Sequence, residues 1–481
     1  MEARSSAGIA RDAVRGGGLL GLRQVFAQAL NLAGYALVAR LLGPAELGVL
    51  GIALFVLGFL GTCGGAGLQA SLIRLPDEPT AKEYRAVFTL QEAVMGVIAL
   101  GAIVAAPGLA ALYGRPPAEA WLFRMVGVTL VVSSFQAIPA AMLERRLAFG
   151  KVALVEIAQA LAYNVVLVAL VWAGFGTASF GAALLARAAT GALLATLASP
   201  WPARPLWDWQ RARGFLRVGA PLQGTVLVGQ LKDSITPIFI GLAAGAAAVG
   251  YVQWAQTLAA GPLWASMVLN RVYLPTFAAV QREPATLARF AAVAVRATHA
   301  LVAPGAILLL ALAEPVTRLV FGPQWLPALP IFRLLWLANL VAPTTTVVLA
   351  LLAALGDTRT SLRFAFVWLV ATWVFGVPLV LLAGGLGYAL ANTAVLTTNV
   401  FLFRLARARV ALHLAAATVP VWLWAAAVGV VVHLAERLRP CTDLGWLAAY
   451  LAAGGILYLA GLALLAPREL ARVWQWAQGR G

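Results

Sequence analysis

The sequence contains few charged residues, and this shortage excludes most classes of soluble protein. Charged residues make up 11% of the 481 residues, hydrophobic residues make up 62%, and the mean hydropathy is +0.88. A soluble domain is about a quarter charged and about half apolar. No long polar segment leaves room for a separate soluble domain. The composition therefore predicts an all-α polytopic membrane protein.

Cysteine and histidine are also scarce, and several catalytic motifs are missing. Cys63 and Cys441 provide no disulfide framework, and His299, His413 and His433 are too scattered to form a metal site with them. The ATP-binding sequence G-x-x-x-x-G-K-[S/T] does not occur, and no nucleophile–base arrangement stands out. We expect neither an enzyme nor an ATP-driven pump. We expect no cofactor, and coupling to H⁺ or Na⁺ stays open.

Long apolar runs fill the chain instead. About 20 apolar residues cross a bilayer, and the apolar windows predict about fourteen membrane helices. They are expected at 18–41, 46–73, 85–112, 118–142, 151–173, 177–199, 214–241, 246–276, 286–312, 325–354, 361–382, 385–405, 413–434 and 443–466. Twelve spans are the alternative if the last pair does not cross, but the composition of that pair argues against it.

Basic residues are distributed unevenly over the predicted loops. Roughly 23 of the 35 Lys and Arg fall in the termini and the even-to-odd loops, against about five in the opposite loops. Positive loops favour the cytoplasmic side, so both termini are predicted to be cytoplasmic. This pattern explains the net charge of +17 better than nucleic-acid binding does. The polar start of the chain is expected to lead into the first helix rather than to be a cleaved signal peptide.

A weak internal repeat divides the chain. At an offset of 202 positions, G-P-A-E-L-G (43–48) faces G-A-A-A-V-G (245–250), Gln28 faces Gln230, and Asn31 faces Asp233. Internal repeats are common in secondary transporters. We predict two six-helix bundles related by a pseudo-twofold axis, followed by two further helices. The predicted domains are residues 1–199, a cytoplasmic interfacial linker at 200–213, residues 214–410, and residues 411–481 with the last two helices and a cytoplasmic tail.

Several basic residues fall inside the predicted spans. A charge at mid-bilayer costs about 2.5–3.5 kcal/mol on the lenient insertion scale. Arg23 and Arg271 lie near the cytoplasmic ends of their spans, where a long side chain can snorkel, and both are also substrate-binding candidates. Deeper bases predict a cationic cleft with an anionic guest, and these are Arg187, Lys232, Arg296 and Arg333.

The acids inside the spans are fewer. Glu92 and Glu156 lie toward the cytoplasmic side, and Asp233 is deep. These three are candidate sites for ion coupling. We expect Lys232 and Asp233, as adjacent residues on a helix, to point apart and not to neutralise each other directly.

Uncharged polar residues recur at helical spacing on two of the spans. Gln24, Gln28, Asn31 and Tyr35 share a face of the first span. Glu156, Gln159 and Tyr163 share a face of the fifth, with Asn164 beside them. Such stripes commonly join helices, whereas together with deep arginines they favour a wet central cleft. Gln28 and Asn31 are therefore included among the substrate-binding candidates.

Four short motifs carry a family resemblance. They are A-R-L-L-G-P-A-E-L-G (39–48), G-A-G-L-Q-A-S-L-I-R (65–74), M-L-E-R-R-L-A-F-G-K (142–151) and A-G-F-G-T-A-S (173–179). The chain resembles the polysaccharide-transport branch of the MOP flippase superfamily, in particular Wzx-type oligosaccharide flippases. The likeness is strong over the first 200 residues and weaker beyond.

The resemblance implies a function in the bacterial cytoplasmic membrane. It implies two six-helix bundles, and movement of an undecaprenyl-diphosphate-linked oligosaccharide to the outer leaflet by alternating access. Cavity arginines would hold the diphosphate, and a polysaccharide polymerase and assembly proteins would be partners besides membrane lipids. The leading alternative is a MATE-like multidrug/cation antiporter, which would need acids rather than bases in its cleft. A membrane glycosyltransferase or polymerase would need larger outer loops, and a non-transporting scaffold is a further alternative.

Overall fold

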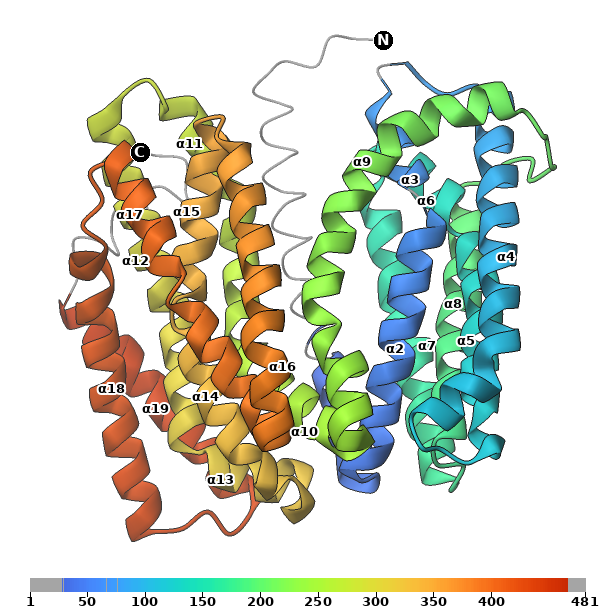
Figure 1. The fold of residues 1–481 in the computed structure, drawn as a ribbon. Helices are drawn as coiled ribbons and strands as arrows, with labels where there is room; N and C mark the ends of the chain where they lie inside the picture. Colours follow the sequence, from blue (N-terminus) through green and yellow to red (C-terminus); the bar gives the residue numbers. More distant parts are fainter. Residues whose placement is uncertain (1–27, 29, 66, 76, 466–481) are drawn as a thin grey trace. The chain divides into compact units, whose positions relative to one another are not determined.

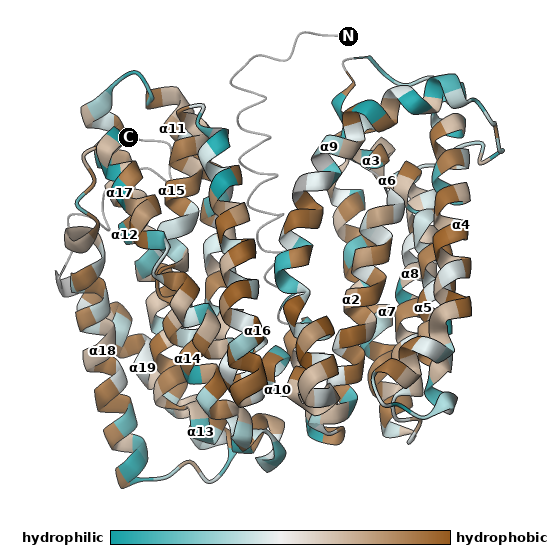
Figure 2. Ribbon diagram, in the orientation of Figure 1, coloured by the Kyte–Doolittle hydropathy of each residue, from teal (hydrophilic) through white to brown (hydrophobic). Residues whose placement is uncertain are grey.

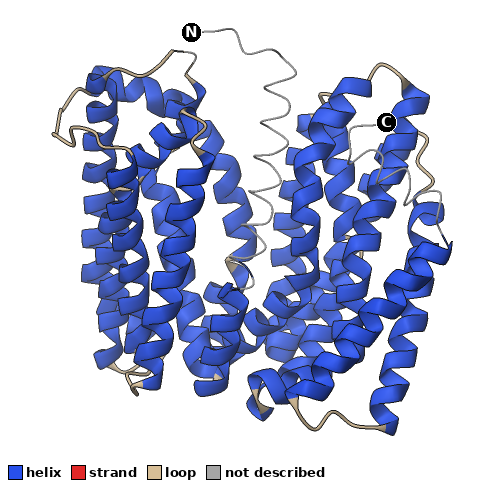
Figure 3. Ribbon diagram, turned by 180° about the vertical axis from the view of Figure 1, so that it is seen from behind, coloured by secondary structure: helices blue, strands red, loops and turns tan. Residues whose placement is uncertain are grey.

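The computed structural model describes residues 28, 30–65, 67–75 and 77–465, and this part of the chain is built from helices with no β-strand (Figures 1 and 3). The predicted all-α fold class is confirmed. Arg23, one of the predicted substrate-binding residues, lies outside the described residues. The main helices are α2 (Pro44–Gly65), α3 (Leu68–Arg74), α4 (Ala81–Leu112), α5 (Ala120–Ser134), α6 (Ala137–Arg145), α7 (Phe149–Trp172), α8 (Ala178–Ala198), α9 (Trp209–Asp233), α10 (Gly241–Ala260), α11 (Met267–Val280), α12 (Pro284–Ala311), α13 (Ala313–Val316), α14 (Leu329–Asn339), α15 (Ala342–Ala354), α16 (Thr358–Leu396), α17 (Asn399–Arg409), α18 (Leu414–Leu438) and α19 (Leu444–Leu465).

Short 3₁₀ and π segments join several of these helices. They are η1 (Pro117–Glu119), η2 (Ile235–Ile240), η3 (Gly261–Ser266), η4 (Thr317–Phe321) and η5 (Pro323–Ala328). A further apolar helix, Leu30–Leu41, precedes α2.

Eleven helical stretches of the described residues are long and apolar enough to cross a membrane. Two of them, Val226–Ser266 and Arg359–Arg409, contain 41 and 51 residues. At 1.5 Å per residue these stretches run to about 60 and 75 Å, against a hydrocarbon layer of about 30 Å. Each contains a non-helical break where the sequence predicts a gap between two spans, at Gly245 in the first and at Ala383 and Gly384 in the second. Figure 2 shows apolar residues along the middle of the helices and polar residues gathered at helix ends and in linkers.

The chain forms two compact units. Unit 1 comprises Met1–Gln253 and Leu362–Ala391, and unit 2 comprises Trp254–Ser361 and Asn392–Gly481. These bounds differ from the predicted domains because α9 packs with α2, α3 and α4 in unit 1. The division at residues 200–213 stays a prediction about the repeat.

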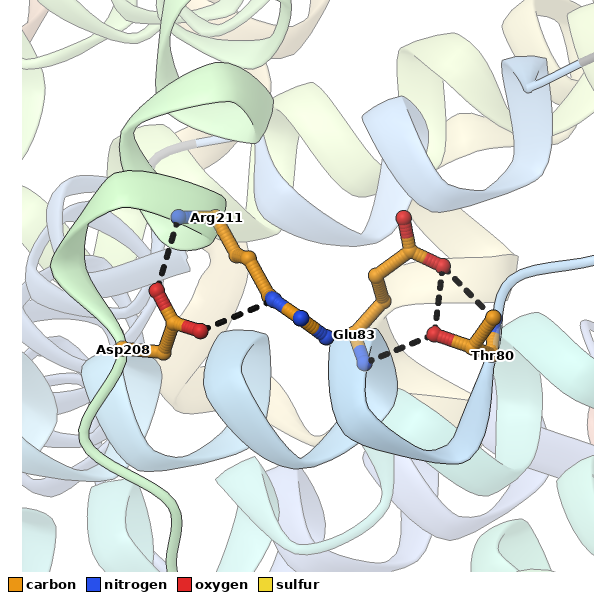
Figure 4. Close-up of polar contacts among 4 residues, drawn as sticks. All are labelled: Thr80, Glu83, Asp208 and Arg211. Atoms are coloured by element: carbon orange, nitrogen blue, oxygen red, sulfur yellow. Dashed lines mark hydrogen bonds and ion pairs between the residues drawn. The ribbon is translucent and has the colours of Figure 1, made fainter.

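Polar caps start the helices that leave the predicted cytoplasmic loops (Figure 4). Thr80 and Glu83 form a capping box at α4, in which the Glu83 carboxylate accepts the Thr80 backbone N–H at 2.7 Å. At α9, the Asp208 carboxylate accepts the Arg211 backbone N–H at 3.1 Å and pairs with the Arg211 guanidinium at 2.8 Å. These contacts satisfy N–H groups that the first helical turn leaves without partners.

The linker between α8 and α9 is fixed along α4. Arg85 donates hydrogen bonds to the carbonyls of Arg204 and Pro205, at 2.9 and 3.2 Å. The ring of Trp201 packs edge-on against Phe88, with centroids 5.1 Å apart. The linker therefore lies on the bundle instead of hanging free of it.

The break between α2 and α3 explains one sequence motif. Gly67 has φ +70°, a left-handed conformation that favours glycine. A Cβ at this position would also collide with the backbone carbonyl of Gly219 in α9. The G-A-G-L-Q motif thus allows a sharp change of direction and a close contact with α9.

The repeated corners contact each other reciprocally within unit 1. A Cβ on Gly48 would collide with the carbonyl oxygen of Ala246, and a Cβ on Gly250 would collide with the carbonyl oxygen of Pro44. Position 48 matches 250 and position 44 matches 246 at the repeat offset, so the two contacts are counterparts. Two backbones related by a local pseudo-twofold axis cross here without intervening side chains, which small residues permit between membrane helices.

Aromatic side chains form part of the interior of unit 2. Trp254 is fully buried and packs on Trp325, Phe321 and Phe332, with ring centroids 5.8, 5.4 and 6.4 Å away. Burying apolar area from several helices around one ring fixes their packing.

Candidate functional site

A polar pocket of about 330 Å³ lies among the membrane-spanning helices of unit 1. Pockets that bind small molecules commonly have volumes of about 300–1,000 Å³. Helices α2 to α8 all contribute residues to its wall. The polar pocket is lined by Gly61, Gly65, Gln69, Gln91, Met95, Ser133, Ser134, Gln136, Ala137, Ala140, Leu143, Glu144, Val152, Val155, Glu156 and Ala195.

Hydrogen bonds between neighbouring helices orient the polar groups of the pocket. Gln91, only 3% exposed, donates its Nε2 to the carbonyl of Ser134 at 3.3 Å. Gln136 Oε1 accepts a hydrogen bond from Gln159 Nε2 at 2.6 Å. Each contact uses part of the capacity of a side chain with two donors and an acceptor. The amides are thereby preorganised while keeping groups for a ligand.

A carboxylate adjoins the pocket behind Ser134. Ser134 Oγ donates to Glu92 Oε2 at 2.8 Å. The other carboxylate oxygen of Glu92, Oε1, is buried without a hydrogen-bond partner among the described residues. A buried carboxylate oxygen without a hydrogen bond costs free energy. Its presence in a native structure therefore suggests a functional role. Of the three predicted coupling acids, Glu156 lines the pocket and Glu92 lies next to it.

The predicted bases that belong to the described residues do not line the pocket. Among the described residues that line the pocket, none is Lys, Arg or His. Arg187 on α8 and Arg333 on α14 are exposed, and Arg296 on α12 donates to the Ala416 carbonyl at 3.4 Å. Arg271 lies on α11. The role of these residues in holding an anion stays a prediction.

Lys232 and Asp233 correct one expectation. Their side chains form an ion pair, with Lys232 Nζ 2.5 Å from Asp233 Oδ1. The prediction that they would not neutralise each other was wrong because it considered only the direction in which each side chain leaves the helix. The four-carbon stem of lysine is long and flexible enough to fold back onto a neighbour.

The polar stripes of the first and fifth spans meet. Asn164 Nδ2 donates to Asn31 Oδ1 at 3.0 Å and to the Ala160 carbonyl at 2.8 Å. Gly34 leaves room for this amide, since a Cβ there would collide with the Asn164 side chain. For Asn31 the structure thus gives a helix-joining contact, while Gln28 is half-buried.

The buried histidine in unit 2 has a packing role. His299 Nδ1 accepts the Trp422 indole N–H at 2.9 Å, so Nε2 carries the proton and donates to Thr344 Oγ1 at 2.8 Å. Both ring nitrogens are therefore occupied in joining α12 to α15 and α18. Within the described ranges, no group of three or more His, Cys, Asp or Glu is placed to hold a metal ion.

Sequence reasoning missed most of the pocket. Gln69, Gln91, Gln136 and Glu144 were not among the candidates, although each interrupts or borders an apolar run. One signal in the sequence could have found them. A polar side chain in a membrane span is energetically costly, so it is expected to have a partner or a function. The sequence analysis favoured the arginines because they are charged, whereas the described lining of the pocket contains amide and carboxylate side chains.

Sequence comparison identifies the family. The family described as "Polysaccharide biosynthesis protein" matches residues 37–330. The chain belongs to this family. It is 28% identical to "Succinoglycan biosynthesis transport protein ExoT" of Rhizobium meliloti (strain 1021) over 338 residues, which cover 70% of this chain and 68% of that protein. It is 22% identical to "Lipopolysaccharide biosynthesis protein WzxC" of Escherichia coli (strain K12), covering 76% of this chain and 73% of that one.

Solved structures establish the fold. A structure of the lipid II flippase MurJ in an inward closed conformation matches with a TM-score of 0.74 at 14% identity, covering 93% of this chain and 99% of that one. An inward-facing multidrug MATE transporter of the MOP superfamily matches with a TM-score of 0.64 at 15% identity, covering 79% and 95%. The predicted MOP-type polytopic membrane fold is confirmed. The predicted resemblance to the polysaccharide-transport family is confirmed, and these relatives are named as a transport protein and a flippase rather than as enzymes.

Proposed function

We propose that the chain moves an undecaprenyl-diphosphate-linked oligosaccharide from the inner to the outer leaflet of the bacterial cytoplasmic membrane by alternating access. The observation that carries this proposal is a polar pocket inside the membrane-spanning helices of a polysaccharide biosynthesis family member. Polar groups within a bilayer are costly and commonly mark a substrate path. The name of the relative ExoT as a transport protein supports the same function.

The diphosphate needs positive charge, and none of the described residues that line the pocket is Lys, Arg or His. We assign this role to the predicted bases Arg187, Lys232, Arg296 and Arg333, of which Arg187 and Arg333 have exposed side chains on membrane-spanning helices. Burying a guanidinium against lipid is unfavourable, whereas a guanidinium binds phosphate oxygens through several donors. Both termini would be cytoplasmic, and polymerase and assembly proteins would act on the product.

Reconstituted liposomes test the proposal. Labelled undecaprenyl diphosphate bearing one hexose is placed in both leaflets, and its movement is followed by protection from an added impermeant reagent. We expect rapid exchange with the unmodified protein and a rate at least several-fold lower for Arg187→Ala and Arg333→Ala. Arg318→Ala is the matched control, because Arg318 pairs with Glu314 outside the pocket at 2.7 Å. Absence of exchange with the unmodified protein would contradict the proposal.

A cation antiporter is the second candidate, and one observation favours it. Two acids, Glu144 and Glu156, line the pocket. Such a site would suit an organic cation. Proton-driven export of ethidium by the same liposomes, without lipid exchange, would establish this function instead.

A further inference from the structure

Glu92 and Ser134 meet at the end of α5, beside the polar pocket. Glu92 lies in α4, within the apolar stretch Ala81–Leu112 that is long enough to cross a membrane. Ser134 is the last residue of α5, and a short break separates α5 from α6. Gln91 donates to the Ser134 carbonyl at 3.3 Å, so two adjacent side chains of α4 contact the end of α5. An acid within a membrane-spanning helix is thus joined to a break in its neighbour.

The hydroxyl group of Ser134 faces two acceptors. Its Oγ lies 2.8 Å from Glu92 Oε2 and 2.7 Å from the carbonyl oxygen of Val131, about one turn earlier in α5. A hydroxyl has one hydrogen to donate, and it can also accept. An ionised Glu92 and the Val131 carbonyl only accept, so one of the two contacts would lack a hydrogen. Both contacts are satisfied when Glu92 is protonated and donates to Ser134, which in turn donates to Val131.

The second carboxyl oxygen of Glu92 favours the same protonation state. Oε1 is buried and has no hydrogen-bond partner among the described residues. An ionised carboxylate accepts hydrogen bonds at both oxygens, and inside a membrane span its charge is costly. A protonated carboxyl carries no net charge, so a buried oxygen without a donor costs less free energy.

The charged and titratable groups around α4 leave this assignment unchanged. Helix α4 packs against α2, α5, α9 and η1. Together with those of α4 itself, the groups on these elements are Glu46, Cys63, Lys82, Glu83, Tyr84, Arg85, Glu119, Arg124, Arg211, Arg213, Arg217, Lys232 and Asp233. Glu92 forms no ion pair with any described residue. Glu144 and Glu156 line the adjoining pocket, and substitution removes their contribution in the test.

We propose that Glu92 is a proton-binding site of the transport cycle. In this structure its carboxyl group holds a proton and donates a hydrogen bond to Ser134. Loss of the proton to water leaves a carboxylate, and Glu92 and the Val131 carbonyl then compete for the single Ser134 hydrogen. Donation to Glu92 withdraws a partner from the last turn of α5, next to the break before α6. Protonation is thereby linked to the geometry of two helices that line the polar pocket. The link to transport rests on the proposed function, whereas the protonation state does not.

Infrared spectroscopy of the full chain in liposomes tests the protonation state. Protonated carboxyl groups and carboxylates absorb at different frequencies. The starting protein is Glu144→Gln/Glu156→Gln, which lacks the two acids of the pocket, and Glu92→Gln is then added to it. At neutral pH we expect the added change to remove the absorption of one protonated carboxyl and no carboxylate absorption. Ser134→Ala should keep this protonated carboxyl and shift its absorption to higher frequency, because the carboxyl loses the hydrogen bond that it donates.

The matched control is Glu314→Gln. Glu314 is exposed and pairs with Arg318 at 2.7 Å, so this change should remove carboxylate absorption only. Glutamine has nearly the volume of glutamate, and an unchanged circular dichroism spectrum shows that each variant is folded. The inference is overturned if Glu92→Gln removes carboxylate absorption instead. If that carboxylate absorption also responds to sodium, the site binds a sodium ion and not a proton.

The lipid exchange assay tests the role of this proton in transport. The exchange rate of the unmodified protein should change with pH. Glu92→Gln should be at least several-fold slower and insensitive to pH, because glutamine can neither release nor regain the proton. A rate of the unmodified protein that is independent of pH, or the same pH dependence in Glu92→Gln, overturns this role. Absence of exchange by the unmodified protein contradicts the proposed function alone, because the infrared result needs no substrate.

Discussion

The reciprocal contact between the repeated corners allows a sharp test of the packing. Gly48→Ala adds one methyl group where the carbonyl of Ala246 already lies, and Gly250→Ala does the same against the carbonyl of Pro44. A backbone carbonyl cannot rotate away as a side chain can. The two helices must therefore separate locally to admit either methyl group.

The size of the effect follows from two opposing terms. Alanine favours a helix over glycine by up to about 1 kcal/mol. Overpacking costs about 1–3 kcal/mol at a tight contact, and a fixed backbone carbonyl places these contacts in the upper part of that range. After the helix-propensity gain is subtracted, each single change should lower the free energy of unfolding by about 1–2 kcal/mol. Because the first methyl group already separates the helices, the second should cost less. We expect the double variant to be at least about 0.5 kcal/mol more stable than the sum of the single effects predicts.

Detergent unfolding of the purified protein, followed by tryptophan fluorescence, measures these differences. Gly58→Ala is the control: Gly58 lies on the same helix, and a Cβ there would meet no heavy atom within 4 Å. This variant should be as stable as the unmodified protein or slightly more so. The reasoning is refuted if Gly48→Ala behaves like Gly58→Ala, or if the effects of Gly48→Ala and Gly250→Ala simply add.

Three further predictions concern a loop, a helix contact and the linker. Burial, followed by the charges of Glu436 and Asp443, raises the pKa of the Cys441 thiol. Because the thiolate is the reactive form, maleimide labelling of Cys441 in a Cys63→Ser protein should need a higher pH than labelling of a fully exposed thiol. An impermeant maleimide should label Cys441 from outside the cell, and labelling from the cytoplasmic side alone would contradict the predicted topology. Asn31→Ala and Asn164→Ala should show a coupling of about 0.6 kcal/mol in a double-mutant cycle, while zero coupling would mean that their hydrogen bond contributes nothing. Arg85→Lys should increase proteolysis between residues 200 and 208, because lysine lacks the planar fork that contacts two carbonyls. Unchanged cleavage would show that the other contacts, Trp201 with Phe88 and Leu206 N–H with Thr89 Oγ1, are enough to hold the linker.

Hydrophobic run length and glycine pattern predicted much of the fold. The gaps expected between spans at 241–246 and 382–385 coincide with the breaks at Gly245 and at Ala383 and Gly384. The glycines matched by the repeat meet in space, because a close backbone crossing restricts both copies to the same small residue. These features are local or steric, and the sequence records them directly.

The polar contacts were less predictable, because they depend on how long side chains turn and on which helices become neighbours. Adjacent residues leave a helix in different directions, so Lys232 and Asp233 were predicted to point apart. In the structure the flexible lysine side chain folds back and pairs with Asp233. Gln91 and Gln136 come from different helices and line the same pocket. No periodicity along a single helix indicates that meeting.

The two halves of the repeat differ at the matched positions Ser134 and Trp336. Trp336, the counterpart of Ser134, packs against Trp422 and donates its indole N–H to the Ala306 carbonyl at 2.8 Å, so that this part of unit 2 is filled. Ser134 instead borders the polar pocket and contacts Glu92. If duplication first gave two equivalent bundles, a bulky Trp336 in the second and a small Ser134 in the first show that this position can change while the fold is kept. The reciprocal glycine contact, where a backbone carbonyl faces each glycine, is where the duplicated architecture should tolerate change least.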